Sequence, residues 1–206
     1  MEQRIKTLKE LKEKLCNWKS YNEIQLQQIM EEFEKIPREE FSSYYVPILI
    51  DRSLIENLIG IGEAFHAHSK ILTNVISSLG NIVWRYKLNP SSKIFDFFKK
   101  ATNNKKVNYY VSLYITSFPQ YCTWEERWTY LLSMPSITPK KKSMANFHTE
   151  VKKELSRNDY MPLETIKEII AMLNTHINSG TLSEYSKGDY LNTINLLKKR
   201  YTAQKG

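Results

Sequence analysis

The side chains best suited to chemistry in this sequence are its four histidines, two of which form the triplet His66-Ala67-His68. On a strand this spacing suits two ligands of one metal ion, because alternate side chains point the same way. The flanking residues have the period of a helix, in which residues two apart point in different directions. We therefore predict a helix-end or turn role for the triplet and no metal site.

The other two histidines, His148 and His176, stand beside the apolar stripes of predicted helices. Neither has a serine, cysteine or carboxylate placed by the sequence as a catalytic partner, and a partly exposed helix position explains both. The adjacent carboxylates of Glu125 and Glu126 diverge on a helix and suit its N-terminal end. The sequence also lacks phosphate loops, zinc-finger spacings and nucleophile elbows. We predict no catalytic residue and no cofactor, and therefore not an enzyme.

Cys16 and Cys122 are the only cysteines, too few for a disulfide framework or a set of zinc ligands. Two unpaired thiols are typical of a reducing compartment. Apolar runs fall far short of the roughly 20 residues that span a bilayer. The charged start of the chain, MEQRIKTLKELKEKL, lacks the apolar core of a signal peptide. We expect a cytoplasmic protein that does not insert into membranes.

The stretch from Ser53 to Leu88 organises the predicted fold. Its apolar residues recur at three- and four-residue steps in two segments on either side of residues 66–69, which is the period of a helix. This central helix pair has the most apolar character and little charge, so we predict that it is the buried centre. Gly60, Gly62 and Gly80 lie inside it and indicate either close helix crossings or simple tolerance of glycine.

The remaining elements are also predicted as amphipathic helices joined by short turns. They are an N-terminal hairpin over 1–36, a short helix near 38–45, helices over 91–102, 105–118, 123–134 and 143–157, and a C-terminal pair over 162–202. Pro37 is expected to end the second helix, and a strand at 46–50 would have no partner. Thr123 and Glu126 have the spacing of a capping box.

The predicted fold class is therefore all-α, with about ten helices in one domain over 1–206. Two arrangements fit this pattern: antiparallel helix pairs stacked as a short irregular α-solenoid, and a helical bundle. The helix pairs start near Ser53, Ser91, Thr123 and Pro162. These intervals of about 32 to 39 residues are typical of helix-pair repeats, although no repeat consensus is visible.

Positive charge is concentrated in the middle of the chain. The net charge is +8, and residues 85–157 hold fourteen Lys and Arg against five Asp and Glu, while the other segments are close to neutral. Twelve of the 25 aromatic residues fall within 85–130. Cations beside aromatic rings can neutralise phosphates and stack bases, and the same side chains are favoured at protein interfaces. We predict that the basic segment 85–157 is the binding surface.

The candidate partner-binding residues are lysines at helix ends and turns of this segment, with two tyrosines outside the apolar stripes. They are Lys99, Lys100, Lys105, Lys106, Tyr109, Tyr121, Lys140, Lys141 and Lys142. The aromatic residues at helical spacing are predicted to pack in the core instead: Tyr110, Tyr114, Trp124 and Trp128.

A helical chain of this size, rich in Lys, Asn and Ile and without a catalytic motif, resembles the HEAT-like immunity proteins with which bacteria neutralise toxins of neighbouring cells. The resemblance covers the whole chain and includes no signature motif. It implies a non-catalytic inhibitor that binds and blocks a toxin domain, often a nuclease. Because a binder of basic nucleases should be acidic, the positive charge implies a partner with an acidic surface. The alternative is a nucleic-acid-binding protein that uses the 85–157 segment.

Overall fold

The computed structural model describes residues 2–39, 41–157 and 159–205. In these ranges the chain forms eleven α-helices and five short 3-10 segments, with no strand. The predicted all-α class is confirmed. Contacts group the chain into two compact units, Met1–Trp124 and Glu125–Gly206. The single domain over 1–206 stays a prediction. Over the described residues, no helix is both long and apolar enough to cross a bilayer.

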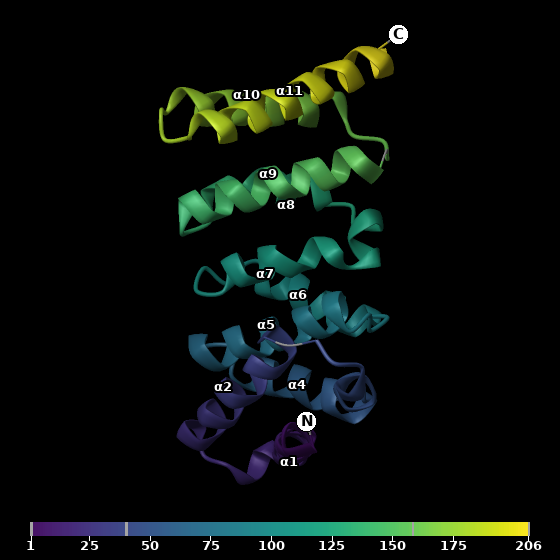
Figure 1. The fold of residues 1–206 in the computed structure, drawn as a ribbon, viewed down its shortest axis with the longest axis vertical. Coiled ribbons are helices and arrows are strands. Elements are labelled where there is room, and N and C mark those ends of the chain that lie inside the picture. Colours follow the sequence, from purple (N-terminus) through teal and green to yellow (C-terminus); the bar gives the residue numbers. More distant parts are fainter. Residues whose placement is uncertain (1, 40, 158, 206) are drawn as a thin grey trace. The chain divides into compact units, whose positions relative to one another are not determined.

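The first unit contains the helices coloured purple to teal in Figure 1. They are α1 (Glu2–Cys16), α2 (Glu23–Glu39), α3 (Val46–Leu49), α4 (Arg52–Ala64), α5 (Ser69–Arg85), α6 (Ser92–Ala101) and α7 (Asn108–Tyr114). The centre of this unit is α5, because eleven of its 17 residues are buried and it packs against α2, α4 and α7. The stretch 53–88 is thus central to this unit, as its apolar periodicity predicts.

Side-chain caps begin three of these helices, and in α4 the backbone N–H of Leu54 donates to Asp51 Oδ1 at 3.1 Å. The backbone N–H of Gln25 donates to Asn22 Oδ1 at 3.0 Å, and the N–H of Asn22 donates to Gln25 Oε1 at 3.1 Å. This reciprocal pair is a capping box and starts α2. At the start of α5, the N–H of Ile71 donates to His68 Nδ1 at 3.2 Å. The helix-end role predicted for residues 66–68 is confirmed at His68.

One proline near the end of α2 acts differently from the prediction. Pro37 does not end α2 but lies in its last turns, and the helix continues to Glu39. Pro47 lies in the first turn of α3, where its missing N–H leaves no intrahelical hydrogen bond unmade. The predicted short helix near 38–45 is instead the end of α2 followed by a 3-10 turn over Ser43–Tyr45.

The helices predicted over 105–118 and 123–134 are both shorter than expected. The first is α7 followed by 3-10 segments over Ile115–Ser117 and Pro119–Thr123. The second, α8, begins only at Arg127, and Glu126 is its N-cap residue. The capping-box prediction at Thr123 is wrong, because its hydroxyl donates to the carbonyl of Gln120 at 3.1 Å in the preceding 3-10 turn.

Gly62 and Gly80 are points where helices approach closely. A Cβ atom on Gly80 would lie 2.2 Å from Cγ of Tyr114, and one on Gly62 would lie 2.5 Å from Cζ of Phe97. Packed interiors leave no room for such a contact. A Cβ on Gly60 would meet only Trp18, at 4.0 Å. Gly62 and Gly80 therefore mark close helix crossings. At Gly60 the helix simply tolerates a glycine.

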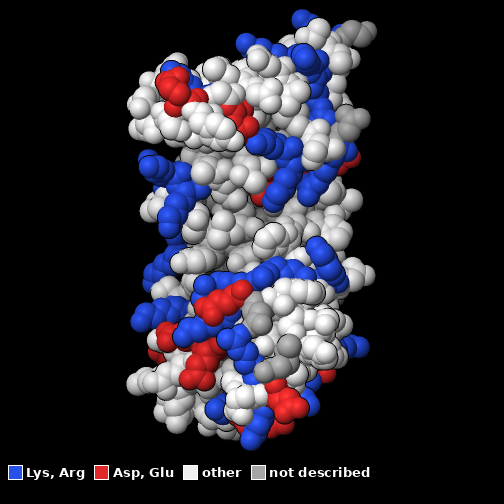
Figure 2. Space-filling view, viewed as in Figure 1, with Lys and Arg blue, Asp and Glu red and all other residues white. Residues whose placement is uncertain are grey.

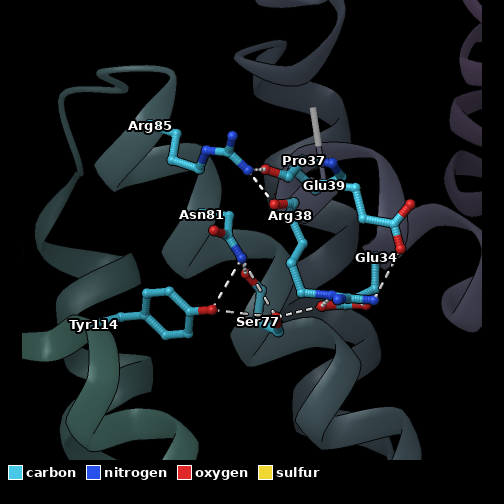
Figure 3. A network of polar contacts seen from close by, with 8 residues as sticks. All are labelled: Glu34, Pro37, Arg38, Glu39, Ser77, Asn81, Arg85 and Tyr114. Atoms are coloured by element: carbon cyan, nitrogen blue, oxygen red, sulfur yellow. Dashed lines mark hydrogen bonds and ion pairs between the residues drawn. The ribbon is translucent and has the colours of Figure 1, made fainter. Parts of the chain in front are cut away.

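A buried polar network joins α2, α5 and α7 around the carboxylate of Glu34 (Figure 3). Ser77 Oγ donates to Glu34 Oε1 at 2.6 Å, and Arg38 Nε donates to the same oxygen at 2.7 Å. Asn81 Nδ2 donates to the hydroxyl oxygen of Tyr114 at 2.9 Å, which lies 3.4 Å from Ser77 Oγ. Burying a carboxylate is costly unless donors surround it, so this network is what allows α2 to pack on α5.

Arg85 extends this network to the end of α2. Its guanidinium donates to the backbone carbonyls of Pro37, at 3.1 Å, and of Arg38. The last carbonyls of a helix have no intrahelical donor, and a positive charge there is favourable. Arg85 therefore caps α2 from a different helix.

The second unit contains the helices coloured green to yellow in Figure 1. They are α8 (Arg127–Ser133), α9 (Lys140–Arg157), α10 (Leu163–Asn178) and α11 (Glu184–Lys205). Residues Phe147, Val151, Leu173 and Leu197 are fully buried, and α11 packs against both α9 and α10. Gly180 follows α10 with a positive φ of 70°, the conformation predicted for a helix-ending glycine.

The close approach at Gly80 leads to a stability prediction. We expect Gly80→Ala to lower the free energy of unfolding by at least about 2 kcal/mol, because the new methyl group must displace the ring of Tyr114. Gly60→Ala is the matched control in the same unit. It should raise stability by up to about 1 kcal/mol, since alanine is the better helix former and the site is open. Urea unfolding followed by circular dichroism measures both, and equal effects would contradict this account.

Candidate partner-binding surface

The candidate lysines fall into two groups, one in each unit. The first group lies at the end of α6 and in the turn before α7, where Lys100, Lys105 and Lys106 are exposed. Lys99 is different, because its Nζ lies 2.7 Å from Asp96 Oδ1 and stands over the ring of Phe95. Because Asp96 balances its charge, Lys99 attracts an acidic partner less than the other three lysines do.

The tyrosine predictions are partly wrong. Tyr121 is fully buried, because the 3-10 turn over Pro119–Thr123 directs its ring into the core beside Trp124. Tyr109 is half-buried, and burial raises its pKa. Tyr110, predicted to be in the core, is 39% exposed. The reason is that the buried face of α7 runs through Val111 and Ser112 and not through Tyr110.

The large aromatic residues that were assigned to the core are only partly covered. Tyr114, Trp124 and Trp128 are half-buried, and the guanidinium of Arg127 lies 4.4 Å from the ring centroid of Trp128. Other aromatic residues of the basic segment are buried, among them Phe95, Phe98 and Phe118, so its aromatic content serves mainly to pack its helices.

The second lysine group forms the first turn of α9. Lys140, Lys141 and Lys142 were expected at the end of a loop, but the helix already includes all three. They are exposed, and this turn contains no acidic residue. Three positive charges at a helix N-terminus oppose the helix dipole, so they do not stabilise α9. Figure 2 shows Lys and Arg side chains at the end where α9 begins, with no acidic side chain among them in this view.

Two of these lysines line a groove of about 560 Å³ within the second unit. The groove combines cations, apolar side chains and hydroxyl groups, and no Asp or Glu is among the described residues that line it. Its lining residues are Pro135, Lys140, Lys141, Met144, Ala171, Met172, Thr175, His176, Ser179 and Thr181. Lys142 belongs to the same helical turn but does not line the groove. The groove therefore combines positive charge with an apolar wall. We call it the α9–α10 groove.

A cavity of about 570 Å³ in the first unit offers a comparison. It is lined by Lys100 together with Leu72, Phe97 and Asn103, but also by the carboxylate-bearing Glu63. A carboxylate beside the lysine weakens attraction for an anionic partner. The α9–α10 groove is thus the better candidate for an acidic partner.

His148 lies buried between α9 and α11, where its sequence neighbours predicted a partly exposed position. It is only 5% exposed, and its ring stacks on Tyr190 with centroids 3.7 Å apart. Its Nε2 lies 2.9 Å from Thr193 Oγ1, and its Nδ1 lies 3.9 Å from Asp189 Oδ2. The partners come from α11, about one helix pair later in the chain, and the local sequence of α9 carried no signal for them.

His148, Thr193 and Asp189 have the residue types of a catalytic triad. Their hydrogen bonds, however, hold the helices together and do not activate a nucleophile. The hydroxyl of Thr193 donates to the backbone carbonyl of Asp189 at 3.0 Å. Its only proton is thereby used, so His148 Nε2 donates to Thr193 and does not accept a proton from it. Thr193 is also 1% exposed. This arrangement gives a substrate no accessible nucleophile.

Burial determines the protonation of the two histidines in this unit. It lowers the pKa of His148 to about 4, more strongly than the nearby carboxylate of Asp189 raises it. Burial also lowers the pKa of His176, which lines the groove. Both imidazoles are therefore neutral at pH 7, and the positive charge of the groove comes from its lysines.

Two acidic residues of α9 point into the second unit. Glu150 and Glu154 are 2% and 1% exposed, and burial raises the pKa of Glu154. Lys153 Nζ donates to Glu150 at 2.7 Å, and Arg157 donates to Glu154. A sequence rich in Lys and Glu would suggest an exposed face here, so sequence reasoning missed these buried acids. In the ranges 2–39, 41–157 and 159–205, no three His, Cys, Asp or Glu side chains gather as a metal site would require.

Comparison with known proteins gives this chain no relative. No family model matches the sequence, and neither the curated proteins nor the solved structures include a match. The site must therefore be interpreted from its own geometry.

The buried histidine leads to a prediction for pH. Because the folded state holds His148 neutral, its contribution to stability is present above the ordinary pKa of about 6.5 and is lost as the pH falls toward 4. As the pH falls from about 7 to about 5, we expect the burial of His148 to lower the free energy of unfolding by about 2 kcal/mol. Urea unfolding of the wild type and of His148→Phe at both pH values measures the contribution of His148 to this pH dependence. A pH dependence unchanged by the substitution would contradict it.

Proposed function

We propose that this protein is a non-catalytic protein-binding module, an immunity-type inhibitor that binds and blocks a toxin domain with an acidic surface. The observation that carries the proposal is the first turn of α9, where Lys140 and Lys141 stand exposed beside an apolar groove. Exposed cations next to an apolar lining suit a protein surface that presents carboxylates around an aliphatic side chain.

The helical architecture supports the same proposal. Within each unit, helices joined by short turns pack side by side, as α4 with α5 and α10 with α11. Such pairs are the building blocks of HEAT-like proteins, whose surfaces commonly bind other proteins. An immunity protein of this kind would act in the cytoplasm, where Cys16 and Cys122 remain reduced.

The alternative, a nucleic-acid-binding protein, has weaker support. Binders of single strands combine cations with exposed rings on which bases stack. Of the two candidate tyrosines, Tyr121 is buried and Tyr109 is half-buried, and Tyr110, which was predicted for the core, is exposed. The lysines alone can still attract phosphates, and salt dependence distinguishes the two functions.

The function is tested with the protein encoded by the neighbouring reading frame, which is the expected toxin. We expect the two purified chains to form a stable one-to-one complex, and the toxin to lose its activity in that complex. Single-stranded DNA and RNA are the comparison ligands. A steep fall of their affinity with salt, by about 0.7 to 0.9 log units per phosphate contact, without any toxin complex would favour the alternative.

Charge reversal in α9 gives a kinetic prediction. We expect the triple substitution of Lys140, Lys141 and Lys142 by Glu to slow association with the acidic partner by about 10-fold or more at low salt, because attraction becomes repulsion. Lys198→Glu with Lys199→Glu is the control, since these exposed lysines lie on α11 and outside the groove. The control should change the rate by less than about 2-fold. Surface plasmon resonance measures both rates, and equal slowing would count against a role for α9.

A further inference from the structure

We propose that the α9–α10 groove is the docking site for an extended acidic segment of the protein partner, in which an aliphatic side chain is flanked by carboxylates. This inference rests on the proposed function and assigns the partner's chemistry. It follows from three properties of the groove: uncompensated lysines, oriented hydroxyl oxygens and an apolar wall.

The lysines of the groove differ from three other lysines of the same unit. Lys152 pairs with Asp189, Lys153 with Glu150 and Lys167 with Glu164, at 2.7 to 3.0 Å. Within the described part of the chain, Lys140 and Lys141 have no such partner. The second unit thus neutralises several of its cations and leaves two facing the groove. Carboxylates of an incoming segment would complete these pairs.

The hydroxyl groups of the groove are oriented as acceptors. Thr175 Oγ1 donates to the carbonyl of Ala171 at 3.0 Å, and Ser179 Oγ donates to the carbonyl of His176 at 2.7 Å. With its proton used inside α10, Thr175 Oγ1 can accept a hydrogen bond from outside. Ser179 Oγ lies 2.9 Å from Thr181 Oγ1 as well, so part of its accepting capacity is already used within the groove. An extended peptide presents backbone N–H groups of the required kind, whereas a nucleic-acid backbone presents only acceptors in its phosphates.

The apolar wall selects the central side chain of the segment. Met144 and Met172 line the groove together with Ala171 and Pro135. Methionine is flexible and polarisable, so it adapts to an aliphatic side chain. A volume of about 560 Å³ is enough for several side chains and exceeds the needs of a lone carboxylate. Among the described residues that line it, His176 supplies a ring and no Phe, Tyr or Trp does, so the groove has no row of rings on which successive bases could stack.

The test uses a fluorescein-labelled peptide with a central leucine flanked by glutamates, and a second peptide with glutamines in place of the glutamates. Fluorescence anisotropy with the full chain should show binding of the glutamate peptide and at least about 10-fold weaker binding of the glutamine peptide. Single-stranded DNA serves as competitor. Displacement of the peptide by DNA at a lower concentration than by unlabelled peptide would overturn the assignment.

Matched variants locate the site. The double substitution of Lys140 and Lys141 by Glu should weaken binding of the glutamate peptide by at least about 10-fold. Lys142→Glu should change the affinity for this peptide by less than about 3-fold. Ala171→Trp should abolish binding without changing any charge, because Ala171 is an exposed residue of the groove wall and the indole would fill the space. Circular dichroism and thermal unfolding confirm that each variant is folded. Equal weakening by Lys142→Glu, or full binding by Ala171→Trp, would refute the site.

The same variants separate this inference from the proposed function. If the neighbour-encoded toxin binds Ala171→Trp and the Lys140, Lys141 double variant as tightly as the wild type, the docking site is wrong and the inhibitor function stands. If the peptide binds in the groove but no toxin complex or protection is found, the inhibitor function fails and the acidic-segment site stands.

Discussion

The packing of the first unit depends on the ring of Tyr114, which lies against the backbone of α5 at Gly80. Only glycine lets α7 come this close, and the close approach brings the tyrosine hydroxyl to Asn81 and Ser77. Ser77 in turn donates to the buried carboxylate of Glu34. One small residue thus permits a polar network that holds α2, α5 and α7 together, and it makes the burial of a charge tolerable.

The second unit solves a related problem in α9, which buries some of its polar residues. His148, Glu150 and Glu154 face inward, whereas the lysines of its first turn face solvent. Of the five acidic residues of the basic segment, Glu150 and Glu154 are buried and paired with Lys153 and Arg157, Asp96 is paired with Lys99, and Glu125 and Glu126 are exposed. The local excess of positive charge lies in the first turn of α9, which contains no acidic residue, and this excess is what the proposed acidic partner would meet.

Sequence reasoning succeeded where a local pattern determines the structure. The apolar period of residues 53–88 predicted both helices and their burial, and the helix-end role of His68 follows from its place between two periodic segments. It failed where a distant residue decides. The partners of His148 lie on α11, and the burial of Tyr121 depends on how the 3-10 turn between two predicted helices packs into the core. Similarly, Pro135 and Pro139 predict a loop that ends in Lys140 to Lys142, whereas α9 already begins at Lys140.

The sequence by itself therefore determined the all-α class, the central helix pair and the location of the positive charge, because periodicity and composition are local or additive properties. Only the tertiary structure decided which charges remain unpaired, which aromatic rings reach the surface and where a groove adjoins the lysines. These properties depend on side chains far apart in sequence, such as Lys140 on α9 and Thr175 on α10. Packing brings such residues together, and no spacing along the chain encodes their distance.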